Sequence, residues 1–177
     1  LWLFKKRDKR QKKNGSYNSI NLMLESIEGN FDNPEVFELL TKHFIELRAA
    51  SPEGSAHVLD IPGLKVPSIK FWSLWENQKL VGSGALKFLD NEHGEFKSIR
   101  VHDNFRNKGY GIKVINHLIN EAIKLKIKKI SVETGAGEFF KPARKLFKKC
   151  DFKPCKPFAH YKEDVNSLYL TKHINND

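Results

Sequence analysis

The chain has 177 residues, which suits one domain with a sizeable hydrophobic core. Its 40% hydrophobic and 29% charged residues are typical of a soluble globular protein, and no apolar run approaches the roughly eighteen residues of a membrane-spanning helix. The net charge of +10 suits an anionic ligand without requiring one. Cys150 and Cys155 fit neither a redox motif nor a zinc pattern, and the histidines lack ligand spacing, so we expect a cytoplasmic protein without a metal.

Much of the positive charge lies at the N-terminus. Residues 1–17 contain seven Lys or Arg residues against one Asp, which gives +6 of the total +10. This stretch has no hydrophobic periodicity, so we predict a disordered arm over residues 1–18 and a single domain over residues 19–177. The arm can contact nucleic acid weakly, but the chain lacks the aromatic ladder or recognition helix of a nucleic-acid-binding domain.

The domain is predicted to begin with a strand and a helix. Ile20, Leu22 and Leu24 alternate with polar residues, as in a half-buried strand. Residues 33–35, Asn-Pro-Glu, are typical of a helix N-terminus, with an N-cap, a proline and an early acidic residue. The side chains of this helix that we expect to face the core are Val36, Leu39, Leu40, Ile45 and Leu47.

Three strands in succession follow a short irregular or helical piece, and this order argues against the regular strand–helix alternation of a dinucleotide-binding fold. The chain then alternates between helices and strands and is expected to end in two strands. The predicted elements are strands over 68–75, 79–89 and 95–101, a helix over 109–126, a strand over 129–134, a helix over 139–149, and strands over 153–161 and 167–173.

The most informative segment is residues 106–111, Arg-Asn-Lys-Gly-Tyr-Gly, which joins a predicted strand to a predicted helix. The first N–H groups of a helix have no intrahelical partner, and the helix dipole adds positive charge, so a basic turn at this place suits an anion. Gly109 and Gly111 let a phosphate approach the main chain without meeting a Cβ. We therefore predict a phosphorylated ligand here. The alternative is a basic turn whose glycines only permit tight geometry.

The spacing separates the known phosphate motifs. A P-loop requires Lys and then Ser or Thr after its glycines, whereas Lys108 precedes them. A dinucleotide-binding loop requires a third glycine where this chain has Val114. The remaining pattern, R-x-x-G-x-G between a strand and a helix, resembles the pyrophosphate loop of the GNAT superfamily of N-acetyltransferases. The order of the elements over residues 20–174 resembles this superfamily as well.

The resemblance implies a fold and an activity. The fold is α+β (mixed α/β), with a mostly antiparallel sheet of six to seven strands that splays between the fourth and fifth, flanked by about four helices. The activity is transfer of an acetyl group from acetyl-CoA to a primary amine of a small molecule or peptide, by direct attack in a ternary complex. A homodimer is compatible with this interpretation. The alternative is a catalytically weak acyl-CoA-binding protein with a sensing or regulatory role.

The resemblance also implies how acetyl-CoA binds. The backbone of residues 107–112 holds the pyrophosphate, and Arg106 and Lys108 add positive charge. Main-chain groups of the preceding strand bind the pantetheine and the acetyl carbonyl, where a preorganised N–H stabilises the developing oxyanion. The cofactor-binding residues are then Ile99, Arg100, Val101, Arg106, Asn107, Lys108, Gly109, Tyr110, Gly111 and Ile112.

Glu95 is the predicted general base. It precedes Arg106 by eleven residues, as does the strand glutamate that serves as base in GNAT histone acetyltransferases. Strand parity predicts that Glu95 shares one face with Lys97, Ile99 and Val101. The competing interpretations are an ion pair between Glu95 and Lys97, and a catalytic role for Glu133 at the end of the next strand.

The general acid is where the sequence departs from the family. GNAT members commonly carry a tyrosine in the pattern A-x-x-L-Y-x-x-x-G-F, and this tyrosine protonates the leaving sulfur. Here residues 143–152 read ARKLFKKCDF, with Phe147 at the tyrosine position and Asp151 at the glycine position. Because phenylalanine cannot donate a proton, we expect Tyr161 to replace it, with His160 behind it. The other interpretation is that Tyr161 is a half-buried sheet residue.

Overall fold

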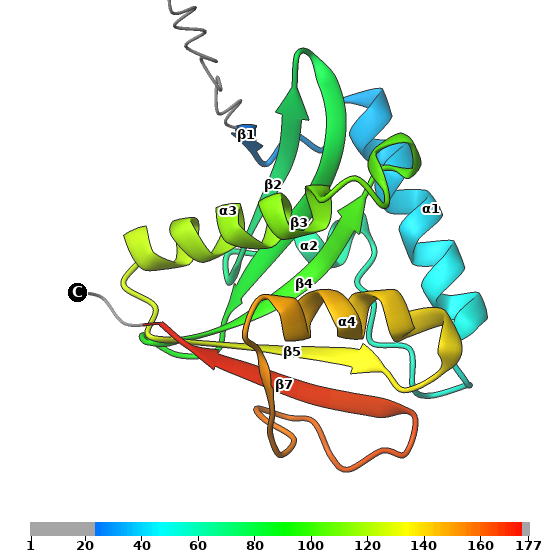
Figure 1. Ribbon diagram of the computed structural model, residues 1–177, viewed down its shortest axis with the longest axis vertical. Helices are drawn as coiled ribbons and strands as arrows, with labels where there is room; N and C mark the ends of the chain where they lie inside the picture. Colours follow the sequence, from blue (N-terminus) through cyan, green and yellow to red (C-terminus); the bar gives the residue numbers. More distant parts are fainter. Residues whose placement is uncertain (1–23, 175–177) are drawn as a thin grey trace, which may run out of the picture.

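The computed structural model describes residues 24–174, so most of the predicted first strand and the whole basic arm lie outside the described residues. The described elements follow the predicted order (Figure 1). They are β1 (Glu25–Glu28), α1 (Pro34–Ala50), α2 (Ile61–Leu64), β2 (Ile69–Glu76), β3 (Lys79–Phe88), β4 (His93–Val101), a 3-10 turn (Asp103–Phe105), α3 (Tyr110–Lys124), β5 (Lys129–Gly135), a second 3-10 turn (Glu138–Phe140), α4 (Lys141–Lys149), β6 (Lys153–Pro154) and β7 (Ser167–His173).

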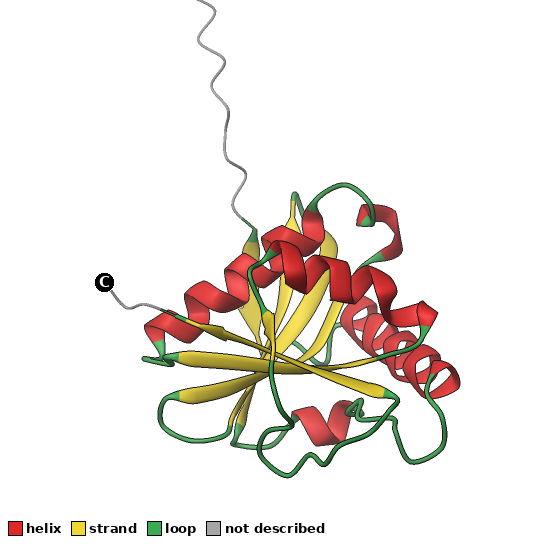
Figure 2. Cartoon of the chain, turned by 60° about the horizontal axis from the view of Figure 1, so that its bottom comes forward, coloured by secondary structure: helices red, strands yellow, loops and turns green. Residues whose placement is uncertain are grey.

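The strands form one seven-stranded sheet in the order β1-β2-β3-β4-β5-β7-β6. All neighbouring pairs are antiparallel except β4 and β5, which are parallel. Helices cover both faces of this sheet (Figure 2). The predicted α+β fold, with its mixed and mostly antiparallel sheet, is therefore confirmed.

The two faces of the sheet bury separate hydrophobic clusters. The cluster under α3 and α4 includes Leu74, Leu86, Phe96, Leu118 and Phe147 and extends across β5. The cluster under α1 and α2 is smaller and rests on β2 and β3. Its buried members are Val36, Leu39, Leu40, Leu64, Phe71, Trp75, Leu80 and Ala85.

The sheet splays between β4 and β5, as predicted. These strands pair only at their first residues, where His93, Gly94 and Glu95 face residues 129–131. Beyond this point β4 stays paired with β3 up to Val101, while β5 stays paired with β7 up to Gly135. The two halves of the sheet therefore diverge and leave an opening between them.

A β-bulge in β4 changes which side chains share a face. Ser98 has a positive φ of 50°, and the register between β3 and β4 shifts at this place. As a result, Ile99 and Val101 pack against the cluster under α3, whereas Glu95 and Arg100 lie on the opposite face. The predicted face shared by Glu95, Ile99 and Val101 is wrong because an extra residue in a strand reverses its side-chain alternation.

Helix α1 begins as predicted, and the side chain of Asn33 caps it by accepting hydrogen bonds from the first free N–H groups. Its inward face differs from the prediction at one position. His43 is buried, whereas Ile45 is 60% exposed and Leu47 is half-buried. Two residues advance an α-helix by more than half a turn, so His43 and Ile45 cannot both face the sheet.

The predicted strand over residues 153–161 is mostly wrong. Only Lys153 and Pro154 pair with β7, and the chain then forms a loop up to β7. Pro154 and Pro157 have no N–H to donate to a strand ladder, which explains why pairing ends here. Tyr161 consequently lies in this loop, where its N–H donates to the carbonyl of Phe158 at 3.0 Å.

Candidate active site

The opening between β4 and β5 contains a cavity of about 1000 Å³. Its walls come from one side of α1, the second half of β4, the loop before α3, the end of β5 and α4. The loop and the start of α3 contribute Arg106, Asn107, Gly109, Gly111 and Ile112, whereas the predicted residues Lys108 and Tyr110 do not line the cavity. A smaller hollow of about 350 Å³ lies between β1, β2 and α2, and none of the predicted site residues lines it. The large cavity is therefore the candidate site.

Gly109 shapes the loop at one end of the cavity. It has a φ of 82°, a left-handed conformation that favours glycine, and it is the N-cap of α3 without a side-chain cap. Within residues 24–174, the backbone N–H groups of residues 107–111 have no hydrogen-bond partner. The N–H of Ile112 donates to the carbonyl of Gly109 at 3.2 Å. Five free N–H groups at a helix N-terminus form a cradle for an anion.

Glycine is required at position 111 for helix packing as well, a role that the sequence did not indicate. A Cβ added to it would lie 2.7 Å from Cδ2 of Leu146 on α4, which is closer than such atoms approach. The absence of this Cβ therefore allows α3 and α4 to pack closely. Gly111 also lines the cavity, so the same glycine serves the helix contact and the edge of the cradle.

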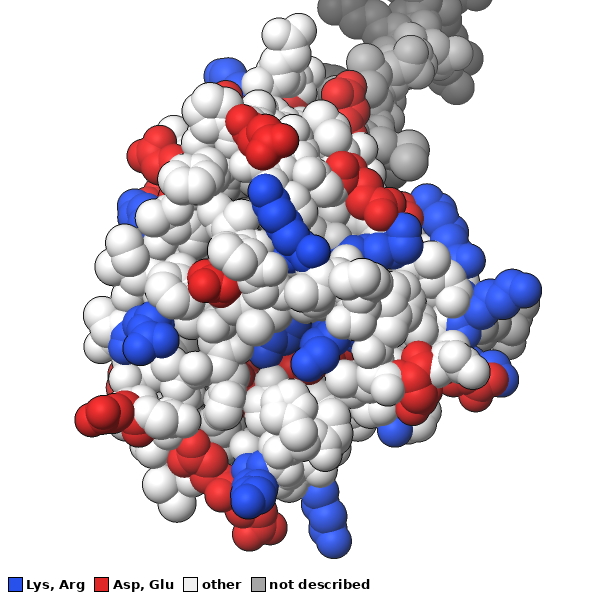
Figure 3. All heavy atoms as spheres, turned by 180° about the vertical axis from the view of Figure 1, so that it is seen from behind, with Lys and Arg blue, Asp and Glu red and all other residues white. Residues whose placement is uncertain are grey.

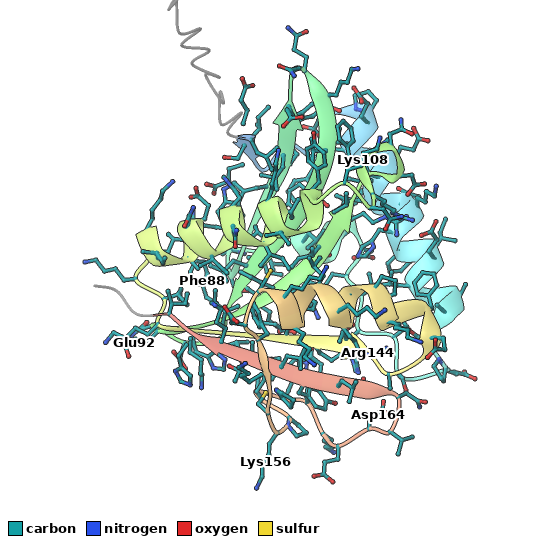
Figure 4. All side chains as sticks on the ribbon, in the orientation of Figure 1. Phe88, Glu92, Lys108, Arg144, Lys156 and Asp164 are labelled. Carbon is teal, nitrogen blue, oxygen red and sulfur yellow. The ribbon has the colours of Figure 1, made fainter. Side chains whose placement is uncertain are left out.

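The cations of the loop add little charge to the cavity. Nη2 of Arg106 lies 2.7 Å from the carboxylate of Asp103. Lys108, labelled in Figure 4, donates through Nζ to the carbonyl of Asn104 at 2.9 Å and does not line the cavity. Lys113, on the first turn of α3, lies 3.3 Å from Glu76. The loop thus contributes mainly its backbone N–H groups to the cavity rather than free positive charge.

The second half of β4 forms the floor next to this cradle. Ile99, Arg100 and Val101 all line the cavity, as the prediction of pantetheine contacts requires. The guanidinium of Arg100 is buried and turned toward α1, where its Nη2 lies 2.6 Å from Glu46. Of these three residues, the two apolar side chains pack on the core, so their main chain is what remains for a ligand.

His43 was not predicted as a site residue, because a lone histidine on a helix carries no motif. It lines the cavity from α1 and is buried, and its Nδ1 has no hydrogen-bond partner in the described part of the chain. Burial, together with the nearby positive charges of Arg100 and Arg106, lowers its pKa to about 3. The ring is therefore neutral at physiological pH.

The structure brings the two predicted catalytic residues together. Oε1 of Glu95 accepts hydrogen bonds from the hydroxyl of Tyr161 at 2.5 Å and from Nζ of Lys97 at 3.2 Å. Lys97 also donates to the Tyr161 hydroxyl at 2.9 Å and to the carbonyl of His57 at 3.0 Å. Burial and the charge of Glu95 raise the pKa of Tyr161. Glu95 is fully buried, and only Lys97 of these three residues lines the cavity.

Glu133, the competing carboxylate, lies on the cavity wall at the end of β5. Its Oε1 accepts a hydrogen bond from the hydroxyl of Ser167 at 2.6 Å. Burial raises its pKa, although Ser167 and the positive charges of His57 and Lys97 act in the opposite direction. A carboxylate with a raised pKa that faces a cavity is better suited to accept a proton than an ordinary carboxylate.

The residue at the usual tyrosine position offers no proton donor. Phe147 lines the cavity but is buried, and the centroid of its ring lies 5.3 Å from the ring centroid of Phe152. His160 stacks on Tyr161 with the ring centroids 4.8 Å apart, and it does not line the cavity. No group of His, Cys, Asp or Glu side chains within residues 24–174 has the arrangement of a metal site.

The face seen from behind in Figure 3 carries basic and acidic side chains interspersed, without a continuous basic area for nucleic acid. None of the helices between residues 24 and 174 is long and apolar enough to span a membrane.

Residues 33–152 match the Acetyltransferase (GNAT) family. The chain is 43% identical over 140 residues to an uncharacterized N-acetyltransferase, YsnE, of Bacillus subtilis, covering 79% of this chain and 93% of that protein. It is 37% identical over 139 residues to an uncharacterized N-acetyltransferase, YedL, of Escherichia coli, covering 78% of this chain and 87% of that protein. An acetyltransferase of Bacillus subtilis, solved in complex with CoA, superposes with a TM-score of 0.63 at 19% identity, covering 86% of this chain and 99% of that structure.

Proposed function

The chain belongs to the GNAT family of acetyltransferases and is an acetyl-CoA-dependent N-acetyltransferase, and on this premise we propose that it acetylates a primary amine of a small molecule or peptide. The observation that carries the proposal is the single cavity, which joins an anion cradle at residues 107–111 to the carboxyl group of Glu133. A donor with a pyrophosphate and an acceptor with an ammonium group would each meet a complementary group there.

The donor end fits the pyrophosphate of CoA. The free N–H groups of residues 107–111 are hydrogen-bond donors of the kind that diphosphate oxygens accept, and a Cβ added to Gly109 would meet nothing within 4 Å, which supports this assignment. Ile99, Arg100 and Val101 would accompany the pantetheine through their main chain. Acetyl-CoA supplies the acetyl group as an activated thioester, so the protein itself has to position it and to move protons.

We assign the proton-accepting role at the acceptor end to Glu133. An alkyl ammonium has a pKa near 10.4 and cannot attack until it loses a proton, which a nearby carboxylate can accept. The free amine then forms the new C–N bond, the C–S bond breaks, and the departing thiolate takes up a proton. Glu133 lines the cavity, and its raised pKa makes it a stronger base than an ordinary carboxylate.

Glu95 and Tyr161 would then position a cavity-lining residue without lining the cavity themselves. They hold the ammonium of Lys97 in place, and Lys97 is the member of this cluster that faces the cavity. Glu95 is fully buried and does not line the cavity, whereas Glu133 does, so we rank Glu133 first and keep Glu95 as the alternative base. The hydroxyl of Tyr161 donates to Glu95 and has a raised pKa, so we assign it the role of positioning Lys97. The ammonium of Lys97, which faces the cavity, is the proposed proton source for the leaving thiolate.

The test is a screen of thiol release from acetyl-CoA with amines, amino acids, polyamines and aminoglycosides, followed by Glu133→Gln and Glu95→Gln. We expect Glu133→Gln to lower kcat/KM by about two decades, and activity of the unmodified enzyme to fall as the pH drops through the raised pKa of Glu133. Glu138→Gln is the matched control, since this carboxylate lines the cavity but pairs with Lys141.

A larger loss with Glu95→Gln would return the role of base to Glu95. Full activity in both variants would mean that neither carboxylate moves the proton. The second candidate, a weak acyl-CoA-binding regulator, rests on the missing hydroxyl at Phe147. It predicts CoA binding without turnover of any amine in the screen.

A further inference from the structure

Helix α4 presents a row of lysines to the cavity. Lys141, Lys145 and Lys149 recur at every fourth residue, which places them on one side of the helix, and all three line the cavity. Nζ of Lys141 is paired with Glu138 at 3.0 Å. Among the described residues, Lys145 and Lys149 have no carboxylate partner, so two positive charges at the cavity edge are uncompensated.

These lysines lie close to the anion cradle. Leu146, next to Lys145 in the sequence, touches the position where Gly111 would carry a Cβ. Helices α3 and α4 therefore meet at the first turn of α3, and they run alongside each other on the same side of the sheet (Figure 1). Lys149 lies one turn beyond Leu146 on the same helix.

The charge of the donor exceeds what the cradle can balance. CoA carries a pyrophosphate and, in addition, a phosphate on the 3′ position of its ribose. The N–H groups of residues 107–111 suit the pyrophosphate, but Arg106 and Lys113 are already paired with Asp103 and Glu76. Lys108 of the loop has no carboxylate partner among the described residues, but it does not line the cavity. The cavity-lining lysines without such a partner in residues 24–174 are therefore Lys145 and Lys149 on α4.

We propose that Lys145 and Lys149 bind the 3′-phosphate of CoA and make the enzyme select CoA over 3′-dephospho-CoA. The inference rests on the proposed function, since it assumes that CoA occupies this cavity. Two exposed ammonium groups contribute modestly to affinity, so we expect about a tenfold preference for CoA at low ionic strength.

The experiment measures the Kd of CoA and of 3′-dephospho-CoA by calorimetry for the unmodified protein, for the double variant Lys145→Ala, Lys149→Ala, and for Lys148→Ala. Lys148 is the matched control because it is exposed on the same helix but does not line the cavity. The expected result is that the double variant binds CoA about tenfold more weakly and 3′-dephospho-CoA unchanged, while Lys148→Ala alters neither Kd.

Two results would overturn the inference and a third would overturn its premise. If the double variant binds CoA and 3′-dephospho-CoA more weakly by the same factor, the lysines act on the pyrophosphate or through the overall positive potential of the cavity. If it weakens neither, α4 takes no part in donor binding. Failure of the unmodified protein to bind CoA at all would refute the proposed function itself. Unchanged melting temperatures would verify that the variants fold, as substitutions of exposed side chains should.

Discussion

Replacing His43 with glutamine should change how the stability of the protein depends on pH. In the folded protein the imidazole is buried beside Arg100 and near Arg106, and its pKa is lowered from 6.5 to about 3. The other charged groups that surround it are Glu46 on α1, which pairs with Arg100, and Asp103, which pairs with both arginines. The unfolded chain therefore binds a proton at His43 over a pH range where the folded chain does not.

The difference between the folded and unfolded pKa of His43 sets the sign and the size of its contribution to the free energy of unfolding. Because the folded pKa is depressed, the contribution of His43 to stability is complete above about pH 6.5 and is lost as the pH falls toward 3. Each pH unit in this window changes the free energy of unfolding by about 1.4 kcal/mol, so the whole window amounts to about 5 kcal/mol at most. His43→Gln has no proton to bind at this position and should lose less stability on acidification.

Urea unfolding between about pH 7 and pH 4, at constant ionic strength, measures this effect. We expect the curve of unfolding free energy against pH to be shallower for His43→Gln than for the unmodified protein. His117→Gln is the comparison, since burial lowers the pKa of His117 too but Glu121 partly offsets this, which predicts a smaller change. Parallel curves for the His43 variant and the unmodified protein would refute the assignment of a neutral, buried imidazole.

Two further substitutions test the cavity wall. Gly111→Val should weaken CoA binding by tenfold or more and lower the melting temperature, because the new side chain meets Leu146. Adding Leu146→Ala should restore the melting temperature. Full CoA affinity in the single variant would show that Gly111 does not border the donor. Phe147→Tyr should keep or raise kcat, since the ring keeps its packing against Phe152 and gains a hydroxyl at the cavity; a large loss would show that an apolar group is needed there.

The sequence was most informative where local chemistry decides the structure. The cap at Asn33 and the helix after the glycine turn each depend on neighbouring residues, and both are present as α1 and α3. The positive φ of Ser98 has no such signal, because nothing in a serine predicts a bulge. The strand expected over residues 153–161, as one of two closing strands, is limited to Lys153 and Pro154, in a segment that also contains Pro157.

The sequence predicts the backbone of the anion cradle better than it predicts the partners of the charged side chains around it. Arg106 and Lys108 look like phosphate ligands in the sequence, yet Arg106 is paired with Asp103, and Lys108 donates to the carbonyl of Asn104 and does not line the cavity. Likewise the pairing of Glu95 with Tyr161 joins residues far apart in the chain, so only the fold reveals that this carboxylate is enclosed. Side-chain partnerships across the sheet leave no trace in sequence spacing.

The separate hydrophobic clusters on the two faces of the sheet have a consequence for how such an enzyme can diversify. Helix α1 stands on the smaller cluster, formed with β2, β3 and α2, whereas the anion cradle and α4 stand on the larger one. Substitutions at positions such as Leu40 or Leu64 can tilt α1 and reshape its side of the cavity while the foundation under α3 stays intact. Acceptor specificity can therefore change through substitutions of a few residues beneath α1, while the site for the acetyl donor is retained.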